Sequence, residues 1–228
     1  MYGLRTRDQQ KSGANVLFVD EEIFPQNLAV IQTRALPQGM KIQVGNYKEL
    51  AFTPEIFACI LQYPNASGSV EDYREFVEKA HAAHCKVAVD ADIMSLALLV
   101  PPGEWGADIV FGSTQRLGIP LFYGGPSAAY FATRDEYKRN MPGRIIGWSK
   151  DKYGKLAYRM ALQTREQHIK REKATSNICT AQALLATMAG FYAVYHGQEG
   201  IKNIAKRIHS ITTWLNKALT RLGYVQHN

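Results

Sequence analysis

The amino-acid sequence predicts an α/β fold, with a mostly parallel sheet and helices on both of its faces. Two observations lead to this prediction. Over the first two-thirds of the 228 residues, short apolar runs typical of buried strands alternate with amphipathic stretches of helical spacing. Two long helical segments then follow towards the C-terminus. Strands that alternate with helices form βαβ units with right-handed crossovers, and such units build parallel sheets.

The strand predictions depend on short apolar runs bounded by polar or turn-forming residues. Residues 15–20 and 58–63 are nearly continuous apolar runs, as expected of strands covered on both faces. Residues 40–44 alternate between polar and apolar side chains. Pro64 ends the apolar run at residues 58–63. The predicted parallel strands are residues 15–20, 40–44, 58–63, 86–90 and 107–111, and an antiparallel strand follows at residues 127–132.

The helix predictions depend on spacing and on one proline. Pro25 suits the first turn of a helix, which we expect to continue to about Arg34. Residues 70–84 place apolar side chains on one face at helical spacing, and residues 135–140 are expected to form a short helix. The apolar face of the longer segment comprises Tyr73, Phe76, Val77 and Ala80.

The last third of the chain changes character. Residues 142–162 contain three glycines and are expected to be a loop. Residues 177–196 form a nearly all-apolar helix, and a helix that is apolar all round is expected to be buried. Residues 197–222 form a second long helix. Its exposed face carries Lys202, Lys206 and Arg207.

The composition is that of an ordinary globular protein, with 46% hydrophobic and 21% charged residues. The apolar runs are too short for a membrane-spanning helix, and the polar residues 1–15 contain no signal-peptide core. Three sparse cysteines, Cys59, Cys85 and Cys179, lack metal-ligand spacing and indicate buried free thiols in a reducing compartment. We therefore expect a cytoplasmic protein with no membrane contact and no metal site.

The positive charge of the chain is concentrated in one segment. Residues 134–173 hold 12 Lys and Arg residues against 5 Asp and Glu residues, an excess that equals the net charge of +7. Such a patch indicates partners rather than fold. Three interpretations stay open: a solvated surface, a free-standing module that binds an acidic protein, and a nucleic-acid binder. The third is the weakest, because the segment has no aromatic ladder for base stacking and no zinc-finger or homeodomain pattern.

Two polar positions are candidates for ligand binding. Asp90 ends a predicted strand, and open parallel sheets bind ligands beyond the carboxyl ends of their strands. A carboxylate there is suited to keep a pyridinium nitrogen protonated, and the alternative is a cap on the following helix. Thr175 and Ser176 precede a long helix, where free N–H groups and the dipole attract an anion; a plain helix cap is the alternative.

The most informative segment is the Gly- and Pro-rich stretch at residues 112–126, which joins two predicted strands. Many pyridoxal-phosphate enzymes of the aspartate aminotransferase superfamily have a similar strand–turn–strand segment that carries the Schiff-base lysine. In this chain the corresponding position is Gln115. An amide cannot form an imine with the cofactor aldehyde, because that chemistry needs a lysine amine. The segment therefore indicates a cofactor-enzyme scaffold without its covalent anchor.

Three stretches, at residues 105–116, 141–147 and 161–182, closely resemble the N-terminal half of the glycine cleavage system P-protein family, glycine dehydrogenase (decarboxylating). The resemblance spans essentially the whole chain, and residues 159–182 are its most specific part. It implies two related halves of fold-type I pyridoxal-phosphate transferase architecture, each with a seven-stranded type of sheet. Only the C-terminal half carries the cofactor lysine. By this resemblance Gln115 occupies the lysine position, and the chain has no catalytic residue of its own.

The resemblance also implies roles for the polar candidates. Asp90 falls where the active half keeps its pyridine-nitrogen aspartate, and Thr175 and Ser176 fall where it has a serine-rich helix start. We expect these three cofactor-binding positions to be vestigial or to contribute to the partner's site. A basic face that attracts the cofactor phosphate, the glycine carboxylate or an acidic carrier is expected at the substrate or partner cleft. Its residues are Arg144, Arg165, His168, Arg171 and Lys173.

The function implied by the resemblance is a supporting one. The complete enzyme uses pyridoxal phosphate to decarboxylate glycine and transfers the aminomethyl group to the lipoyl arm of H protein. The cofactor is bound to the C-terminal half, which in some bacteria is a separate subunit, so this chain is expected to be inactive alone. Its expected partners are that lysine-bearing half, in a dimer, together with glycine and H protein.

The resemblance implies a large domain that is incomplete at both ends. We expect residues 1–205 to form the transferase-like large domain, without its N-terminal part. Residues 206–228 are expected to begin the helix that leads to a small C-terminal domain. The chain therefore resembles an excised fragment of a longer protein.

Overall fold

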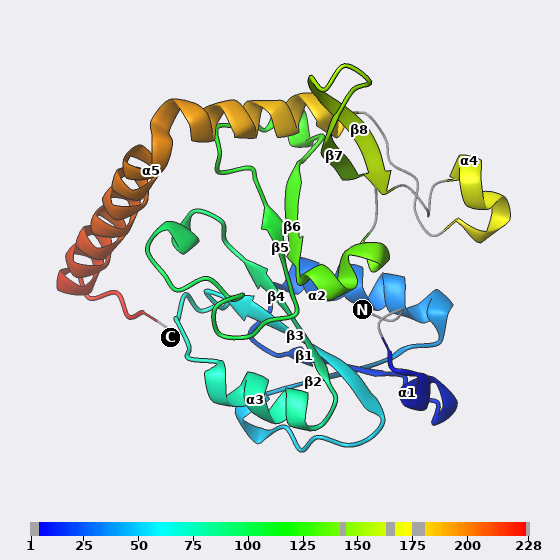
Figure 1. The fold of residues 1–228 in the computed structure, drawn as a ribbon. Coiled ribbons are helices and arrows are strands. Elements are labelled where there is room, and N and C mark those ends of the chain that lie inside the picture. The colour runs from blue at the N-terminus through cyan, green and yellow to red at the C-terminus, as the bar shows by residue number, and fades with distance from the viewer. Residues whose placement is uncertain (1–4, 142–144, 163–166, 175–180, 227–228) are drawn as a thin grey trace.

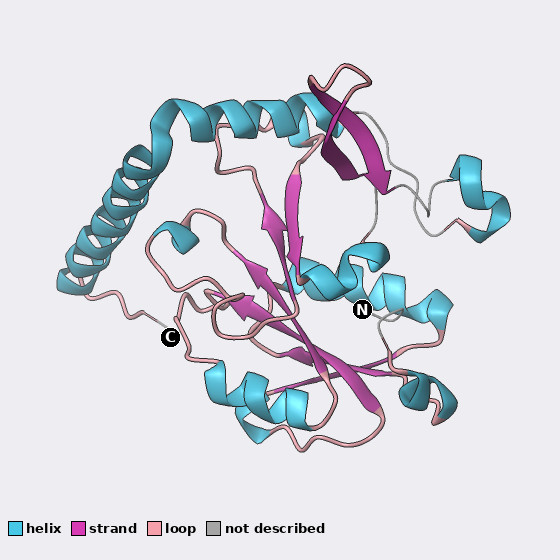
Figure 2. Ribbon diagram, viewed as in Figure 1, coloured by secondary structure: helices cyan, strands magenta, loops and turns pink. Residues whose placement is uncertain are grey.

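The computed structural model describes residues 5–141, 145–162, 167–174 and 181–226. A twisted six-stranded sheet forms its centre, and a separate two-stranded hairpin precedes the long C-terminal helix (Figure 1, Figure 2). The predicted α/β class with a mostly parallel sheet is confirmed, although the sheet has six strands in these residues.

The strands of the central sheet lie in the order β2-β1-β3-β4-β5-β6. The first five in this order run parallel, and β6 pairs antiparallel with β5, as predicted for residues 127–132. The carboxyl ends of the parallel strands therefore meet at one edge of the sheet. The bounds are Val16–Asp20 for β1, Lys41–Gly45 for β2, Ile56–Tyr63 for β3, Lys86–Ala91 for β4, Ile109–Ser113 for β5 and Ala129–Thr133 for β6.

The helix predicted over residues 70–84 is shorter than expected. It begins at Arg74, just after Asp72, whose carboxylate accepts the Arg74 N–H at 3.1 Å and pairs with the Arg74 side chain. The α-helices are α1 Arg7–Lys11, α2 Pro25–Ala35, α3 Arg74–Ala82, α4 Gln167–Lys170 and α5 Gln182–Arg221. Short 3-10 helices span Leu36–Gln38, Tyr47–Glu49, Ser95–Ala97, Phe122–Gly124, Asp135–Asn140 and Arg171–Lys173.

Two apolar layers hold the sheet between helices. On one face, Phe76 and Val77 of α3 pack against side chains of β3 and β4. On the other face, Leu28 and Ile31 of α2 pack against β1 and β3. Alternate residues of a strand point to opposite faces, so strands covered on both sides need continuous apolar runs. Helices on both faces are therefore confirmed.

The thiols of Cys59 and Cys85 are buried, as predicted, and their Sγ atoms lie 3.4 Å apart. Burial raises the pKa of the Cys59 thiol, because the thiolate form loses its solvation. Cys179 lies outside the described residues.

The prediction of a loop at residues 142–162 is wrong for the described part of that segment. β7 (Ile145–Lys150) and β8 (Leu156–Leu162) form an antiparallel hairpin. Glycines suggested a loop, but Gly147 lies within β7, where an added Cβ would meet the Ala161 side chain at 2.9 Å. Gly154 occupies the turn with a φ of 78°, a conformation that favours glycine.

The hairpin exposes one apolar face. Trp148 is paired with Tyr158, and Ile146 with Met160, so that these four side chains share a face across the two strands. Trp148 is 78% exposed and Tyr158 is 74% exposed. Within the described residues, nothing covers this face, which is unusual for side chains of this size.

The prediction of a buried helix at residues 177–196 is also wrong for its described part. α5 buries Leu185, Ala189 and Ala205, which pack in a small apolar cluster with residues from elsewhere in the chain. A helix that is apolar all round needs cover on every side, whereas the described residues cover α5 along one side. Its large exposed side chains include Leu184, Phe191, Val194, Tyr195 and Trp214.

The predicted division of the long helical region is confirmed at Gly197. This residue has a φ of 60° and a ψ of −178° and interrupts the helical conformation of α5. Only glycine adopts such a conformation without strain. The domain boundary predicted at residue 206 lies within the second part of α5 and stays a prediction. No helix in the described ranges combines the length and the apolarity needed to cross a membrane.

Candidate functional site

A cleft of about 1090 Å³ opens at the carboxyl edge of the parallel strands. It lies between the start of α2, the loop after β3, the ends of β4 and β5 and the start of β6, at the edge where open parallel sheets bind ligands. Its polar lining includes Asn27, Gln62, Asn65, Asp90, Asp92 and Arg116, and its aromatic lining includes Phe24, Phe111, Tyr130 and Phe131.

Asp90 is the buried carboxylate of the cleft. It lies near the end of β4, is 8% exposed and accepts a hydrogen bond from the side-chain amide of Asn27 in α2. Burial raises the pKa of Asp90 to about 6, because a buried carboxylate loses the solvation of its charged form. The turn after β4 is capped by Asp92 rather than by Asp90, because Asp92 Oδ1 accepts the Met94 N–H at 3.2 Å.

Gln62 fixes the backbone beneath Asp90. Its Nε2 donates to the Asp90 carbonyl at 3.0 Å, and the hydroxyl of Tyr73 donates to the Gln62 carbonyl at 3.2 Å. Among the described residues, the Gln62 Oε1 atom is buried without a hydrogen-bond partner. On the other side, the Tyr130 hydroxyl donates to the Ala91 carbonyl at 2.7 Å. The end of β4 is therefore held from two sides.

Charge at the rim of the cleft is largely neutralised. Arg116 donates from Nη1 to Oδ2 of Asp92, forming an ion pair in which both side chains are partly exposed. Among the described lining residues, Arg116 is the only cationic side chain, whereas Asp90 and Asp92 supply two carboxylates. The cleft therefore carries no excess of positive charge from these residues.

The Gln115 side chain turns back on its own loop. Its Nε2 donates to the carbonyls of Ile119 at 2.6 Å and of Pro120 at 3.0 Å, while the neighbouring Ser113 and Arg116 line the cleft. These bonds stabilise the turn after β5 and leave the Gln115 amide outside the cleft lining.

The cleft matches part of what a pyridoxal-phosphate site needs. Asp90 supplies the acceptor for a protonated ring nitrogen, and Phe111 and Tyr130 supply flat apolar surfaces. The described lining contains no lysine, so it has no amine that forms an imine with the cofactor aldehyde. The covalent form of the cofactor does not fit this cleft, and no step of its chemistry is assigned here. Groups of three metal-ligating side chains are likewise absent from the described residues.

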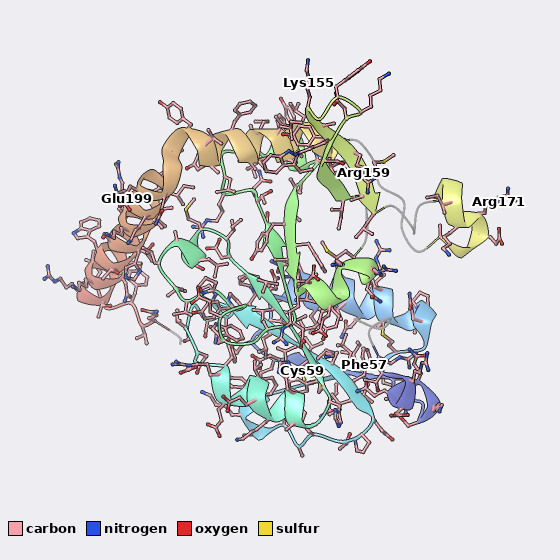
Figure 3. All side chains as sticks on the ribbon, in the orientation of Figure 1. Phe57, Cys59, Lys155, Arg159, Arg171 and Glu199 are labelled. Carbon is pink, nitrogen blue, oxygen red and sulfur yellow. The ribbon has the colours of Figure 1, made fainter. Side chains whose placement is uncertain are left out.

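The predicted basic face is only partly within the described residues. Arg144 and Arg165, like Thr175 and Ser176, lie outside them. His168 belongs to α4, and Lys173 to the 3-10 helix after it, but their side chains are also outside the described part. The side chain of Arg171 is exposed on this segment, which lies apart from the central sheet (Figure 1, Figure 3). Arg171 is not among the described residues that line the cleft.

The sequence did not indicate the three residues that hold Asp90 and the end of β4. Asn27 is in the first turn of a helix, Gln62 is one polar residue in an apolar strand, and Tyr130 is in the antiparallel strand. Only Gln62 gave a local signal, since a polar side chain inside a buried strand needs a partner.

Comparisons with known proteins agree with this architecture. Residues 3–228 match the model of the family described as glycine cleavage system P-protein. A Bacteroides thetaiotaomicron protein named glycine dehydrogenase (decarboxylating) is 80% identical over 228 residues, and one of the same name from Bacteroides fragilis is 78% identical. In each case the whole chain is matched, and it spans 24% of the length of the relative.

A solved structure shares the fold. The crystal structure of a glycine decarboxylase (P-protein) of the glycine cleavage system, in inhibitor-bound form, is 34% identical with a TM-score of 0.77. The match covers 85% of this chain and 46% of that chain. The chain belongs to the glycine cleavage system P-protein family.

Proposed function

We propose that this chain is the part of a glycine dehydrogenase (decarboxylating) that lacks the cofactor lysine and supports the catalytic half. The observation that carries the proposal is the cleft itself, whose described lining holds the buried carboxylate of Asp90 but no lysine. Membership of the P-protein family and the names of the relatives support it.

The proposed chemistry belongs to the complete enzyme. There, pyridoxal phosphate bound to the other half supplies the electron sink for the decarboxylation of glycine. The residues of this chain have a positioning role. Asn27 holds the Asp90 carboxylate, while Gln62 and Tyr130 fix the end of β4 below it. Their arrangement keeps the shape of a cofactor cleft without offering a covalent anchor.

Two exposed apolar surfaces support pairing with the lysine-bearing half. The hairpin exposes Trp148 and Tyr158, and the first part of α5 exposes Phe191, Val194 and Tyr195, each by 70% or more. Apolar groups of this size on a soluble protein mark interaction sites. We propose that the lysine-bearing half covers these two surfaces in the dimer.

The basic segment supports a second interaction. Lys150, Lys152, Lys155 and Arg159 of the hairpin, with Arg171 beyond it, all have exposed side chains. Long-range attraction by such a patch raises the association rate with an acidic partner and weakens with salt. We propose that the partner is the lipoyl-carrying H protein, engaged in the complex with the catalytic half. A stand-alone module would instead bind an acidic protein without that half.

The absence of an anchored cofactor is tested on the purified chain. The chain is incubated with pyridoxal phosphate, its absorbance is recorded, and the mixture is reduced with borohydride and mapped by peptide mass. We expect no stoichiometric label on any single lysine. A complete glycine dehydrogenase provides the positive control. Stoichiometric label on one lysine of this chain would contradict the proposal.

The role of the basic segment is tested in the rebuilt complex. Arg159→Ala and Arg171→Ala should lower H-protein-dependent turnover more at low salt than at high salt, because screening removes the attraction. Lys11→Ala, at an exposed lysine of α1, is the matched control. A merely solvated surface predicts changes within about 0.5 kcal/mol at every ionic strength. Binding of H protein by this chain alone would favour the stand-alone module.

A further inference from the structure

A second pocket, of about 280 Å³, lies at the opposite edge of the sheet, where β4 and β5 begin. Its charged lining consists of Lys86, Arg134 and Asp108, and the rings of His81 and His84 border it. None of these residues takes part in the cleft described above. We propose that this pocket is a binding site for a small oxyanion of the phosphate type.

The carboxylate of Asp108 is already satisfied by the protein. Oδ2 accepts the Val87 N–H at 2.8 Å and lies 2.9 Å from His81 Nε2, and Oδ1 accepts the Tyr137 hydroxyl at 3.1 Å. Burial by itself raises the pKa of Asp108, but the Val87 N–H, His81 and Lys86 outweigh it and hold the pKa below its usual value. At 1% exposure, this carboxylate faces the interior rather than the solvent.

The two cations of the pocket are not saturated by that carboxylate. Lys86 Nζ lies 3.8 Å and Arg134 Nη1 lies 3.9 Å from Asp108 Oδ1, both too far for a hydrogen bond. Arg134 Nη2 donates to the Gly106 carbonyl at 2.6 Å, and Lys86 Nζ lies 5.1 Å from the centre of the Tyr137 ring. The ammonium and part of the guanidinium therefore keep N–H donors without a hydrogen-bond acceptor among the described residues.

The balance of charge and donors determines the class of ligand. Among the residues that line the pocket, Lys86 and Arg134 carry two positive charges against the one negative charge of Asp108, so the lining itself has a positive excess. The Lys86 side chain is 26% exposed, which limits the screening of its charge by solvent, whereas the Arg134 side chain is exposed at 43%. An ammonium and a guanidinium that converge on one space are suited to an oxyanion, which accepts several charge-assisted hydrogen bonds at once.

The proposal is tested by calorimetric titration of the full chain with inorganic phosphate, with chloride adjusted to hold the ionic strength constant. We expect one saturable site in the wild type. Lys86→Met keeps the apolar stem and removes the charge, and it should weaken binding by roughly tenfold or more, because a charge-assisted hydrogen bond is lost. Lys86→Arg should retain binding. Lys41→Met, at an exposed lysine that begins β2 and lines neither pocket, is the matched control and should bind phosphate as the wild type does.

A second measurement does not depend on any variant. Amide chemical shifts of the wild type are followed during the same titration, and we expect the signals of Val87 and Arg134 to move while that of Gly112 in the cleft does not. Phenyl phosphate is titrated as well: tighter binding than inorganic phosphate would assign the site to a phosphate monoester, and equal binding would assign it to the free anion. Shifts confined to the cleft, or shifts that chloride reproduces, would overturn the proposal.

Discussion

Asp90→Asn isolates the electrostatics of the cleft. Asparagine removes an ionisable group while keeping an oxygen that accepts the hydrogen bond from Asn27. The pKa of Asp90 is about 6 in the folded chain, against 3.8 for an ordinary aspartate. Between these two values the unfolded chain has released its proton while the folded chain retains it. The contribution of Asp90 to the free energy of unfolding of the wild type therefore falls as the pH rises from about 4 to about 6.

The size of the effect follows from the shift. A difference of about two pKa units, at 1.36 kcal/mol per unit, corresponds to about 3 kcal/mol. Because asparagine carries no charge at any pH, the variant should be more stable than the wild type by up to about 3 kcal/mol near pH 7. Near pH 3, below both pKa values, Asp90 is largely protonated in the folded and the unfolded chain, and the two proteins should be nearly equally stable.

The assay is urea denaturation of both proteins at several pH values between these limits. Asp72→Asn is the control of opposite sign, because the exposed Asp72 has its pKa lowered to about 2 by hydrogen bonds from Arg74. The stability that Asp72 contributes is present above its unfolded pKa and is lost as the pH falls through its folded pKa, so this variant should lose stability near pH 7. A difference between wild type and Asp90→Asn that is constant over the whole pH range would refute the reasoning.

Three further substitutions test the backbone and the buried charge, each by its urea midpoint. Gly112→Ala should cost about 1 to 3 kcal/mol or more, because a Cβ would meet the Ala91 carbonyl oxygen at 2.2 Å; a neutral result would mean that the strands separate freely. Gly197→Ala should cost about 1 to 3 kcal/mol from its φ of 60°, whereas the control Gly190→Ala, with open space around it, should be neutral or stabilising. Asp108→Ala should cost about 3 to 5 kcal/mol, since the Val87 N–H and the Tyr137 hydroxyl lose their buried acceptor and the nearby cations lose their counter-charge; a loss below about 1 kcal/mol would contradict this account.

The central sheet was predictable because its local pattern and its burial agree. Residues 15–20 and 58–63 are apolar on both faces, and the structure covers both faces with helices. In such strands both alternating sets of residues are apolar, so the local pattern and the burial of the strand predict the same structure. The start of α3 was less predictable, because the Asp72 carboxylate lies outside the helix and binds Arg74, its first residue, which competes with a helical conformation at residues 70–73.

The cleft was predictable in its position but not in its contacts. Asp90 was identified because it ends a strand, and the ends of parallel strands converge. Its partner Asn27 lies 63 residues away in the sequence, and nothing in a helical first turn indicates a bond to that carboxylate. Gln115 was identified by resemblance, but its bonds to Ile119 and Pro120 depend on the path of the turn.

The hairpin and α5 show why the remaining errors occurred together. In both, the sequence correctly indicates large apolar side chains, yet the described residues leave Trp148, Tyr158 and Phe191 largely exposed. An apolar pattern specifies that a surface needs cover, but it does not specify which chain provides the cover. The hairpin was mistaken for a loop because its glycines were weighed without the cross-strand pairing of Trp148 with Tyr158. Both errors concern surfaces that we propose to be covered by the lysine-bearing half. Because burial of these apolar side chains is favourable, the isolated chain should bind that half when the two are mixed.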